Sequence, residues 1–353
     1  MTERIRVNAS ESYDVVIGEG ILSSAAEAIE EALGKPALMI VSDDNVFPLY
    51  GEKLKKLLAG SGFRVESFVF PHGEKSKSLK TYGELAESLC RARFTRSDAI
   101  IALGGGVVGD LAGFAAATYQ RGIRFVQIPT SLLACVDSSV GGKTGVDLES
   151  GKNQVGCFHQ PSLVICDTET LNTLPPEQYS CGCAEIIKYA VIGSEKFFRE
   201  LEKTPVSERY GSVIGTCVRM KRDIVEKDEF DRGLRMTLNF GHTFGHAAEA
   251  CSGYSVLHGQ AVAMGMAAIT KSAAAQGICP ADMPERIDGI LGLYGLPTRI
   301  PYRAEDIKKA VLVDKKNAGG SVRLIVPEAI GRCRTENVPA DKIGLWLEKG
   351  GIL

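Results

Sequence analysis

The chain has 353 residues, of which 44% are apolar and 24% charged, and its formal net charge is -2. These values are typical of a globular protein long enough for two domains, and they give no electrostatic reason to expect binding to nucleic acid or to a membrane surface. No window reaches the roughly 18 apolar residues that a membrane span needs, and the start lacks a signal-peptide pattern, so we expect a cytoplasmic protein. Ten cysteines without a C-x-x-C pair indicate reduced thiols rather than disulfides or a thiolate zinc site.

The first 165 or so residues alternate short β-rich runs with amphipathic stretches, which predicts an α/β domain. Helical patterns occupy residues 21–33 and 78–93, and the predicted strands are 13–18, 37–43, 64–70, 99–105, 124–129 and 163–167. A glycine-rich span from 130 to 161 has few periodic signals, so we expect an irregular loop with a functional role.

Beyond residue 175 the pattern changes to long helical periods, at 177–192, 211–227 and 259–276. A strand-like pair, SVRLIVP and GRCRT, follows late in the chain, and the stretch KIGLWLEK predicts a final helix. We therefore expect an α/β domain over 1–175, a mostly α-helical domain over 176–353, and a cleft between them.

A glycine-rich turn joins a predicted strand to a predicted helix in AIIALGGGVVGDLAGF, where Gly104, Gly106 and Gly109 fit G-x-G-x-x-G. Glycines at these positions let backbone N–H groups approach a pyrophosphate, which favours a dinucleotide site over a turn needed for packing alone. The acidic ribose partner expected at the end of the next strand is missing. Asp43 or Asp44, at the end of an earlier strand, could replace it; the alternative is that they cap a helix before Val46.

Several cationic side chains are candidates for binding an anionic substrate. Lys143 and Lys152 each follow a glycine in the 130–161 span, where a phosphate or carboxylate could approach the backbone, although they could also be solvated loop lysines. Neither fits the Walker spacing. Lys188, Lys221 and Arg235 recur in the second half of the chain, beside the candidate metal ligands described next.

Two histidines four residues apart, His242 and His246 in NFGHTFGHAAEA, would share one helical face and could bind a metal or could cap and pack the helix. His258 opens another apolar helix, and Glu185 lies in a helix too apolar to carry a carboxylate without a cation or hydrogen-bond donors. The spacing leaves open which three of these four residues would hold the ion.

Taken together, the stretches GGGVVGD, DSSVGGKTGVD, GKNQVGCFHQP, AEIIKY, NFGHTFGHAAE and LHGQAVAMGM resemble the 3-dehydroquinate synthase family of sugar-phosphate cyclases over essentially the whole chain. The resemblance implies a Rossmann-like NAD-binding domain, a helical metal-binding domain and a homodimer. By matching positions, Glu185, His242 and His258 would hold Zn²⁺ or Co²⁺. His246 would instead face the substrate as a phosphate contact and proton-transfer group.

The resemblance also implies the binding residues. For NAD they are Asp43, Glu74, Lys77, Gly105, Gly106, Val107, Val108, Gly109, Asp110, Thr130, Ser131, Asp137, Lys143, Lys152, Thr170, Leu171, Asn172 and Thr173. For the substrate they are Lys143, Lys152, Asn153, Lys188, Lys221, Arg235, Asn239, Lys316 in preference to Lys315, and Arg121 from the partner subunit. Ser131, Gln154, Cys157 and Gln260 depart from the family pattern, and Gln260 bears on the surroundings of the metal.

The reaction implied by the resemblance belongs to the shikimate pathway, which makes aromatic amino acids. It converts 3-deoxy-D-arabino-heptulosonate 7-phosphate, a phosphorylated sugar acid, to 3-dehydroquinate and phosphate through transient oxidation by NAD⁺, phosphate elimination, re-reduction and intramolecular aldol closure. Three other functions remain as alternatives. They are a sister cyclase whose seven-carbon sugar phosphate lacks a carboxylate, a metal-dependent NAD polyol dehydrogenase, and a nucleotide-binding regulator without chemistry.

Overall fold

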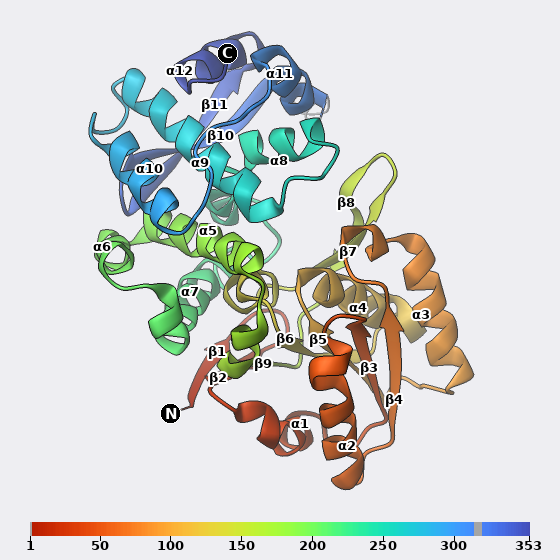
Figure 1. Cartoon of the computed structure of the whole chain (residues 1–353). Coiled ribbons are helices and arrows are strands. Elements are labelled where there is room, and N and C mark those ends of the chain that lie inside the picture. The colour runs from red at the N-terminus through yellow and green to blue at the C-terminus, as the bar shows by residue number, and fades with distance from the viewer. Residues whose placement is uncertain (1, 314–319) are drawn as a thin grey trace. The chain divides into compact units, whose positions relative to one another are not determined.

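The structure is a computed structural model that describes residues 2–313 and 320–353. The chain forms two compact units, an N-terminal α/β unit of residues 1–175 with 210–230 and a mostly helical unit of residues 176–209 with 231–353 (Figure 1). The predicted fold class, a Rossmann-like α/β domain followed by a helical domain, is confirmed.

A seven-stranded sheet forms the centre of the α/β unit. Its strands, in spatial order, are β1 (Glu3–Val7), β2 (Tyr13–Gly18), β9 (Leu163–Asp167), β6 (Arg124–Pro129), β5 (Ala99–Gly104), β3 (Leu38–Asp43) and β4 (Val65–Phe70). Only β1 is antiparallel to its neighbour. The six parallel strands were predicted from the sequence, whereas β1, whose run ERIRV carries three charges on the sheet edge, was not.

Helices cover both faces of this sheet, as apolar residues on both sides of a parallel strand require. In β5, Ile101 and Leu103 point into one core with helices α1 (Ala25–Leu33) and α2 (Glu52–Gly60). The alternate residue Ile100 packs into the other core with α3 (Leu79–Arg91) and α4 (Gly106–Thr118). The two cores hold the carboxyl ends of the strands in place, and the candidate cofactor residues lie there.

The glycine-rich span does not form one irregular loop, and that prediction was wrong for its second half. Strands β7 (Lys143–Leu148) and β8 (Gly151–Phe158) form an antiparallel hairpin. Gly145 and Gly156 face each other, and a Cβ at either would lie within 2.6 Å of a backbone oxygen of the opposite strand. The hairpin depends on glycine at this crossing, so it lacks the alternating side-chain pattern by which strands are predicted.

Helix α7 (Tyr210–Val225) was predicted as a helix, but the sequence analysis assigned it to the wrong domain. It belongs to the α/β unit, where it packs against β1, β2 and the short helical turn Ala134–Ser138. The backbone N–H of Asn8 donates to Glu226, and that of Ser10 donates to Glu229, just after the helix. Helical periodicity predicts a helix but does not identify the sheet that receives its apolar face.

The helical unit contains α5 (Pro176–Gly193), α6 (Glu195–Lys203), α8 (His242–Cys251), α9 (His258–Ala275), α10 (Met283–Leu293), α11 (Ala304–Val313) and α12 (Ile343–Lys349). The predicted late strand pair is present as β10 (Ser321–Ala329) and β11 (Arg332–Pro339). Helix α9 is buried along most of its length and packs against α5, α8, α10 and α12. In the described part of the chain, no helix combines the length and apolarity that crossing a membrane requires.

Candidate active site

The glycine-rich turn lies where the order of the strands reverses. The chain proceeds outward from β3 to β4, returns to β5 on the other side of β3, and continues to β6 and β9. In an open parallel sheet, the crevice at the carboxyl ends of two such strands is the usual position of a bound dinucleotide. Gly104 ends β5, Gly105 precedes α4, and Gly106 is its first residue, so the N-terminus of α4 is at this point.

The close packing of this turn explains its glycines. A Cβ at Gly104 would lie 2.5 Å from the Val108 side chain, and one at Gly109 would lie 2.7 Å from Oε1 of Gln127. These two glycines are therefore also required by packing, which was the alternative reading of the motif. Gly106 has more room, because its nearest neighbour would be Oγ of Ser138 at 3.3 Å.

Asp43 ends β3 beside this turn, and its carboxylate caps the chain that follows. Oδ1 accepts hydrogen bonds from the backbone N–H groups of Asn45 at 3.0 Å and Val46 at 2.8 Å. The hydrogen bonds of this oxygen match the capping role, which was the alternative to ribose binding. A contact between the same carboxylate and ribose stays a prediction. Asp44 instead accepts from the backbone and ring of His72.

A buried lysine connects three of the predicted cofactor and substrate segments. Lys77 lies 2.5 Å from Oδ2 of Asp110 on α4 and donates to Oδ1 of Asn153 in β8, also at 2.5 Å. The backbone N–H of Asn153, whose φ is 55°, donates to Asp147. Lys152 lies 3.8 Å from Glu74, which begins the turn before Lys77.

Burial and charge act in opposite directions on this buried pair. Burial favours the neutral forms, which raises the pKa of Asp110 and opposes the protonation of Lys77. The attraction to Asp110 and Glu74 nevertheless raises the pKa of Lys77 above its ordinary value. The raised pKa of Asp110 favours its neutral form, whereas the raised pKa of Lys77 reflects attraction to an anionic Asp110. We take the pair as ionised, because the Lys77 ammonium lies within hydrogen-bond distance of the Asp110 carboxylate.

Several other predicted residues of the α/β unit lie in segments that follow the strands. Lys221, on α7, donates to the backbone oxygen and Oδ1 of Asp137 at 2.7 and 2.8 Å. The residues Thr170, Leu171, Asn172 and Thr173 form a short helical turn after β9, which Asp167 caps. Thr130 and Ser131 directly follow β6. Lys143 is exposed at the start of β7, and Arg121 is exposed just before β6, at the opposite end of that strand. Lys316 lies outside the described residues.

In the helical unit, three helices bring together one carboxylate and two imidazoles. Glu185 is in the middle of α5, His242 is the first residue of α8, and His258 is the first residue of α9. Close backbone packing holds these helices at the required separation. A Cβ at Gly259 would lie 2.3 Å from Cα of Cys181 on α5, and one at Gly265 would lie 1.9 Å from the carbonyl oxygen of Gly241.

The geometry of this group fits a metal ion. Potential ligand atoms of Glu185, His242 and His258 all lie within 4.8 Å of one another. Nε2 of His242 is 3.6 Å and Nε2 of His258 3.4 Å from the same oxygen, Oε1 of Glu185. Nδ1 of His242 lies 3.1 Å from the carbonyl oxygen of Phe240 and must donate to it, which leaves Nε2 as the free lone pair. One carboxylate and two imidazole nitrogens are an open donor set that suits Zn²⁺ or Co²⁺.

The two histidines have opposite electrostatic environments. Burial lowers the pKa of His242 to about 3, although the charge of Glu185 opposes this shift. Burial also disfavours protonation of His258, but its interactions with Glu185 and Glu249 prevail and raise its pKa to about 10. The two carboxylates therefore favour the protonated ring of His258 when no metal ion is bound, and a metal ion bound at Nε2 would replace that proton.

The other predicted residues of the helical unit lie on α5, on α8 or in the segment that precedes α8. Lys188 is buried one turn after Glu185 on α5 and forms an ion pair with it. His246 is exposed, and its ring centroid lies 5.3 Å from that of His242 and 5.9 Å from that of His258. Arg235, which is 2% exposed, and Asn239 belong to the short helical segment that leads into α8.

Three polar residues have roles that the sequence analysis did not identify. Gln260 accepts a hydrogen bond from the backbone N–H of Leu257, so in this structure it caps α9. Glu249 is buried beside His258, and its place seven residues after His242 on the same helix was a usable signal. Asp147 supports Asn153 from across the hairpin, and no sequence pattern predicts that pairing.

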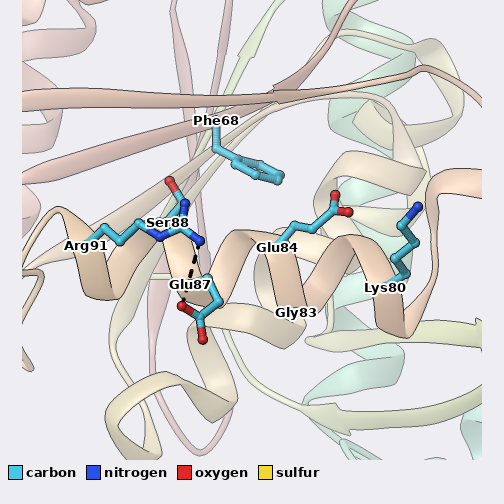
Figure 2. A pocket seen from close by; sticks show the side chains of 7 residues that line it. All are labelled: Phe68, Lys80, Gly83, Glu84, Glu87, Ser88 and Arg91. Atoms are coloured by element: carbon cyan, nitrogen blue, oxygen red, sulfur yellow. Dashed lines mark ion pairs between the residues drawn. The ribbon is translucent and has the colours of Figure 1, made fainter.

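A hollow of about 510 Å³ lies beside α3 in the α/β unit (Figure 2). It is lined by Phe68 of β4 and by Lys80, Gly83, Glu84, Glu87, Ser88 and Arg91 of α3. Glu87 and Arg91 form an ion pair one helical turn apart on the exposed surface of this helix. None of the lining residues is a predicted site residue, so the hollow has no part in the site described above.

Comparisons with known proteins agree with this geometry. Family models described as "3-dehydroquinate synthase N-terminal" and "3-dehydroquinate synthase C-terminal" match residues 67–181 and 182–317. A 3-dehydroquinate synthase of Sinorhizobium medicae is 42% identical over 98% of this chain and 95% of its own length.

Two solved structures extend the agreement to the fold. A 2-deoxy-scyllo-inosose synthase complexed with carbaglucose-6-phosphate, NAD⁺ and Co²⁺ superposes with a TM-score of 0.89 at 26% identity, covering 99% of this chain and 100% of that one. ValA, a 2-epi-5-epi-valiolone synthase of Streptomyces hygroscopicus with NAD⁺ and Zn²⁺ bound, gives 0.88 at 29% identity over 99% of each chain.

The fold thus places the chain in a class of proteins that includes these two synthases, whose solved structures hold NAD⁺ together with a metal ion. The sequence comparisons decide among the members of that class, because they cover nearly the full length at well above 30% identity. The chain belongs to the 3-dehydroquinate synthase family.

Proposed function

We propose that this chain converts 3-deoxy-D-arabino-heptulosonate 7-phosphate to 3-dehydroquinate and phosphate. The observation that carries the proposal is the group of Glu185, His242 and His258, whose ligand atoms lie within 4.8 Å of one another. It occurs in a chain that matches a 3-dehydroquinate synthase along almost its whole length. A regulator without chemistry would have no use for such a donor set.

Two bound groups would supply chemistry that the side chains lack. NAD⁺ supplies a hydride acceptor and the metal ion stabilises negative charge on substrate oxygens, so that oxidation and re-reduction can cancel within one turnover. We assign the metal to Glu185, His242 and His258, and the NAD⁺ pyrophosphate to the turn Gly105–Asp110 at the N-terminus of α4. The backbone N–H groups and dipole of that helix favour a bound anion.

The cationic side chains would bind and orient the substrate, which carries a carboxylate and a phosphate. In the α/β unit, Lys143, Lys152 and Lys221 are assigned to this role together with Asn153. In the helical unit the assigned residues are Lys188, Arg235, Asn239 and His246. Lys188 and Arg235 are almost fully buried, and a charge held away from water attracts an anion more strongly than a solvated one does.

One further assignment depends on a homodimer, which we also propose from the family: Arg121 would contact the substrate phosphate from the partner subunit. Lys316 of the same chain would complete the set of lysines. Arg121 has a φ of 67°, and the neighbouring Gln120 has a φ of 53°. This conformation is uncommon for non-glycine residues and points to a constrained segment.

The test is a turnover assay with the purified protein, NAD⁺, Zn²⁺ and the heptulosonate phosphate, in which released phosphate and absorbance at the NADH wavelength are followed together. We expect stoichiometric phosphate release without lasting NADH. Lasting NADH without phosphate would instead identify a polyol dehydrogenase. Phosphate release only from a seven-carbon sugar phosphate that lacks the carboxylate would identify a sister cyclase.

A variant of His246 distinguishes a proton-transfer role of this residue from a role in metal binding. His246→Ala should slow phosphate release by about 10²–10⁴-fold, the usual contribution of a general acid–base group, while zinc content stays at the wild-type level. Elemental analysis of the purified variant checks the second half of this prediction. Loss of zinc would show that His246 is a ligand and that our assignment of the metal site is wrong.

A further inference from the structure

Glu249 is a buried carboxylate that the proposed reaction leaves without a role. It lies on α8 with His242 and His246, at positions separated by four and three residues, so all three side chains point from the same side of the helix. Only 2% of Glu249 is exposed. A glutamate is almost never buried to this extent without partners that offset its desolvation.

The structure places Glu249 against one of the candidate metal ligands. Oε2 of Glu249 lies 3.5 Å from Nδ1 of His258, and Nε2 of the same ring lies 3.4 Å from Oε1 of Glu185. The imidazole of His258 therefore lies between two carboxylates. Glu185 is on the side of the proposed metal ion, and Glu249 is on the opposite edge of the ring.

His242 has the same arrangement with a different acceptor. Its Nε2 lies 3.6 Å from Oε1 of Glu185, and its Nδ1 lies 3.1 Å from the carbonyl oxygen of Phe240. Metal-binding histidines in proteins usually donate their second ring N–H to a carboxylate or a backbone carbonyl, which fixes the tautomer and the orientation of the ring. Both proposed ligands thus have the pair of neighbours that this rule requires.

We propose that Glu249 is a positioning residue of the metal centre, which accepts the Nδ1–H of His258 and so holds Nε2 toward Glu185 and the ion. The proposal rests on the metal site assigned above. The distance of 3.5 Å is a few tenths of an ångström longer than an ordinary hydrogen bond, and a small rotation of either side chain closes it.

A competing role for Glu249 is direct ligation. His246, Glu249 and His258 form a second group whose ligand atoms lie within 4.8 Å of one another. Two observations favour the positioning role. His246 is exposed, and the edge of His258 that faces Glu249 is Nδ1, whereas Nε2 faces the carboxylate that His242 also approaches.

The experiment measures the Zn²⁺ dissociation constant of the purified full-length chain by competition with a chromogenic chelator, without substrate or NAD⁺. Glu249→Ala should weaken binding by about 10–100-fold, the usual cost of removing the hydrogen-bond partner of a metal-bound histidine. Glu249→Gln keeps an oxygen that can accept from Nδ1, so it should recover most of the affinity. The visible absorption of the Co²⁺-loaded protein should change in the alanine variant and return toward the wild-type spectrum in the glutamine variant.

Three controls separate this role from others. Asp167→Asn alters a buried carboxylate of the α/β unit and should lower the melting temperature without changing the Zn²⁺ dissociation constant. His242→Ala should abolish tight zinc binding. If this variant binds zinc as the wild type does, the proposed metal centre itself is wrong.

An unchanged Zn²⁺ dissociation constant in Glu249→Ala overturns the positioning role alone. A His246→Ala variant that loses as much affinity as Glu249→Ala would identify direct ligation instead.

Discussion

The two units hold their candidate site residues in different ways. In the α/β unit many of these residues lie in turns after strands or in the β7–β8 hairpin, and carboxylates fix such segments by accepting backbone N–H groups, as Asp43, Asp147 and Asp167 do. In the helical unit the candidate metal ligands are on helices, and glycines such as Gly259 and Gly265 let the helix backbones come into direct contact with their neighbours. The first arrangement depends on charge and hydrogen bonds, and the second depends on the small volume of the glycines at the helix contacts.

This difference implies different sensitivities. A capping carboxylate can be lost with a local effect, because each hydrogen bond contributes only about 0.5–1.5 kcal/mol, or somewhat more when one partner is charged. A helix that is forced away from its neighbouring helix moves every side chain that it carries. We therefore expect substitutions in the helical unit to affect stability and the metal together, and those in the loops of the α/β unit to affect one function at a time.

The largest effect is expected at Gly265. Its substitution by alanine places a methyl group 1.9 Å from the carbonyl oxygen of Gly241, which neighbours His242, so α8 and α9 must separate. Gly265→Ala should reduce the free energy of unfolding by about 1–3 kcal/mol, the usual cost of overpacking, and should also weaken zinc binding. Urea denaturation and chelator competition measure the two quantities.

Gly289 provides a matched control on α10, because a Cβ there meets nothing within 4 Å. Gly289→Ala should raise stability by up to about 1 kcal/mol through helix propensity and leave zinc binding unchanged. If Gly265→Ala bound zinc with wild-type affinity, the metal site would not depend on the close contact of α8 with α9, and the contrast between the units would break down.

An intermediate effect is expected at Asp147, which accepts the backbone N–H of Asn153 at 2.6 Å. Asp147→Ala removes the support of a residue whose φ of 55° is otherwise unfavourable. Because removing a charged hydrogen-bond partner costs about 1.5–3 kcal/mol, we expect kcat/KM for the substrate to fall by about 10–100-fold while zinc affinity is unchanged. Glu149→Ala, an exposed change in the same hairpin, should have little effect, and equal losses in the two variants would contradict a specific role for Asp147.

The smallest effect is expected at Asp98, a carboxylate outside the site. Burial would raise its pKa, but hydrogen bonds from the backbone N–H groups of Thr95 and Ala37 prevail and lower it. Because the folded-state pKa lies below the unfolded one, Asp98 stabilises the fold at pH values above the unfolded pKa of about 3.9, and this contribution is lost as the pH falls through the folded-state pKa.

Asp98→Asn should therefore lower the free energy of unfolding by about 1 kcal/mol at pH 7, and its difference from the wild type should shrink as the pH is lowered below 4. The measurement is urea denaturation of the variant and the wild type at pH 7 and at a pH below 4. A difference that stays constant with pH would mean that the geometry of the cap, rather than its charge, stabilises this loop.

Much of the fold was predictable, because buried parallel strands appear in the sequence as short apolar runs and helices as longer apolar or amphipathic segments. The six parallel strands and α9 were found for this reason, and the two elements that were missed or misread, β1 and the hairpin β7–β8, lack such patterns. One is an edge strand that carries three charges, and the other crosses at paired glycines. The assignment of α7 to the helical domain was wrong, because a helical pattern does not show which sheet the helix covers.

The sequence by itself determined the residue types of the site and, through the family motifs, the three residues expected to hold the metal. Local spacing alone left four candidates, because an i, i+4 pair shows that two histidines share a helical face but not what approaches that face. Tertiary structure placed Glu185 between His242 and His258, paired Asp147 with Asn153, and put Glu249 behind His258. These contacts join residues on different helices or strands, so packing decided them where local periodicity could not.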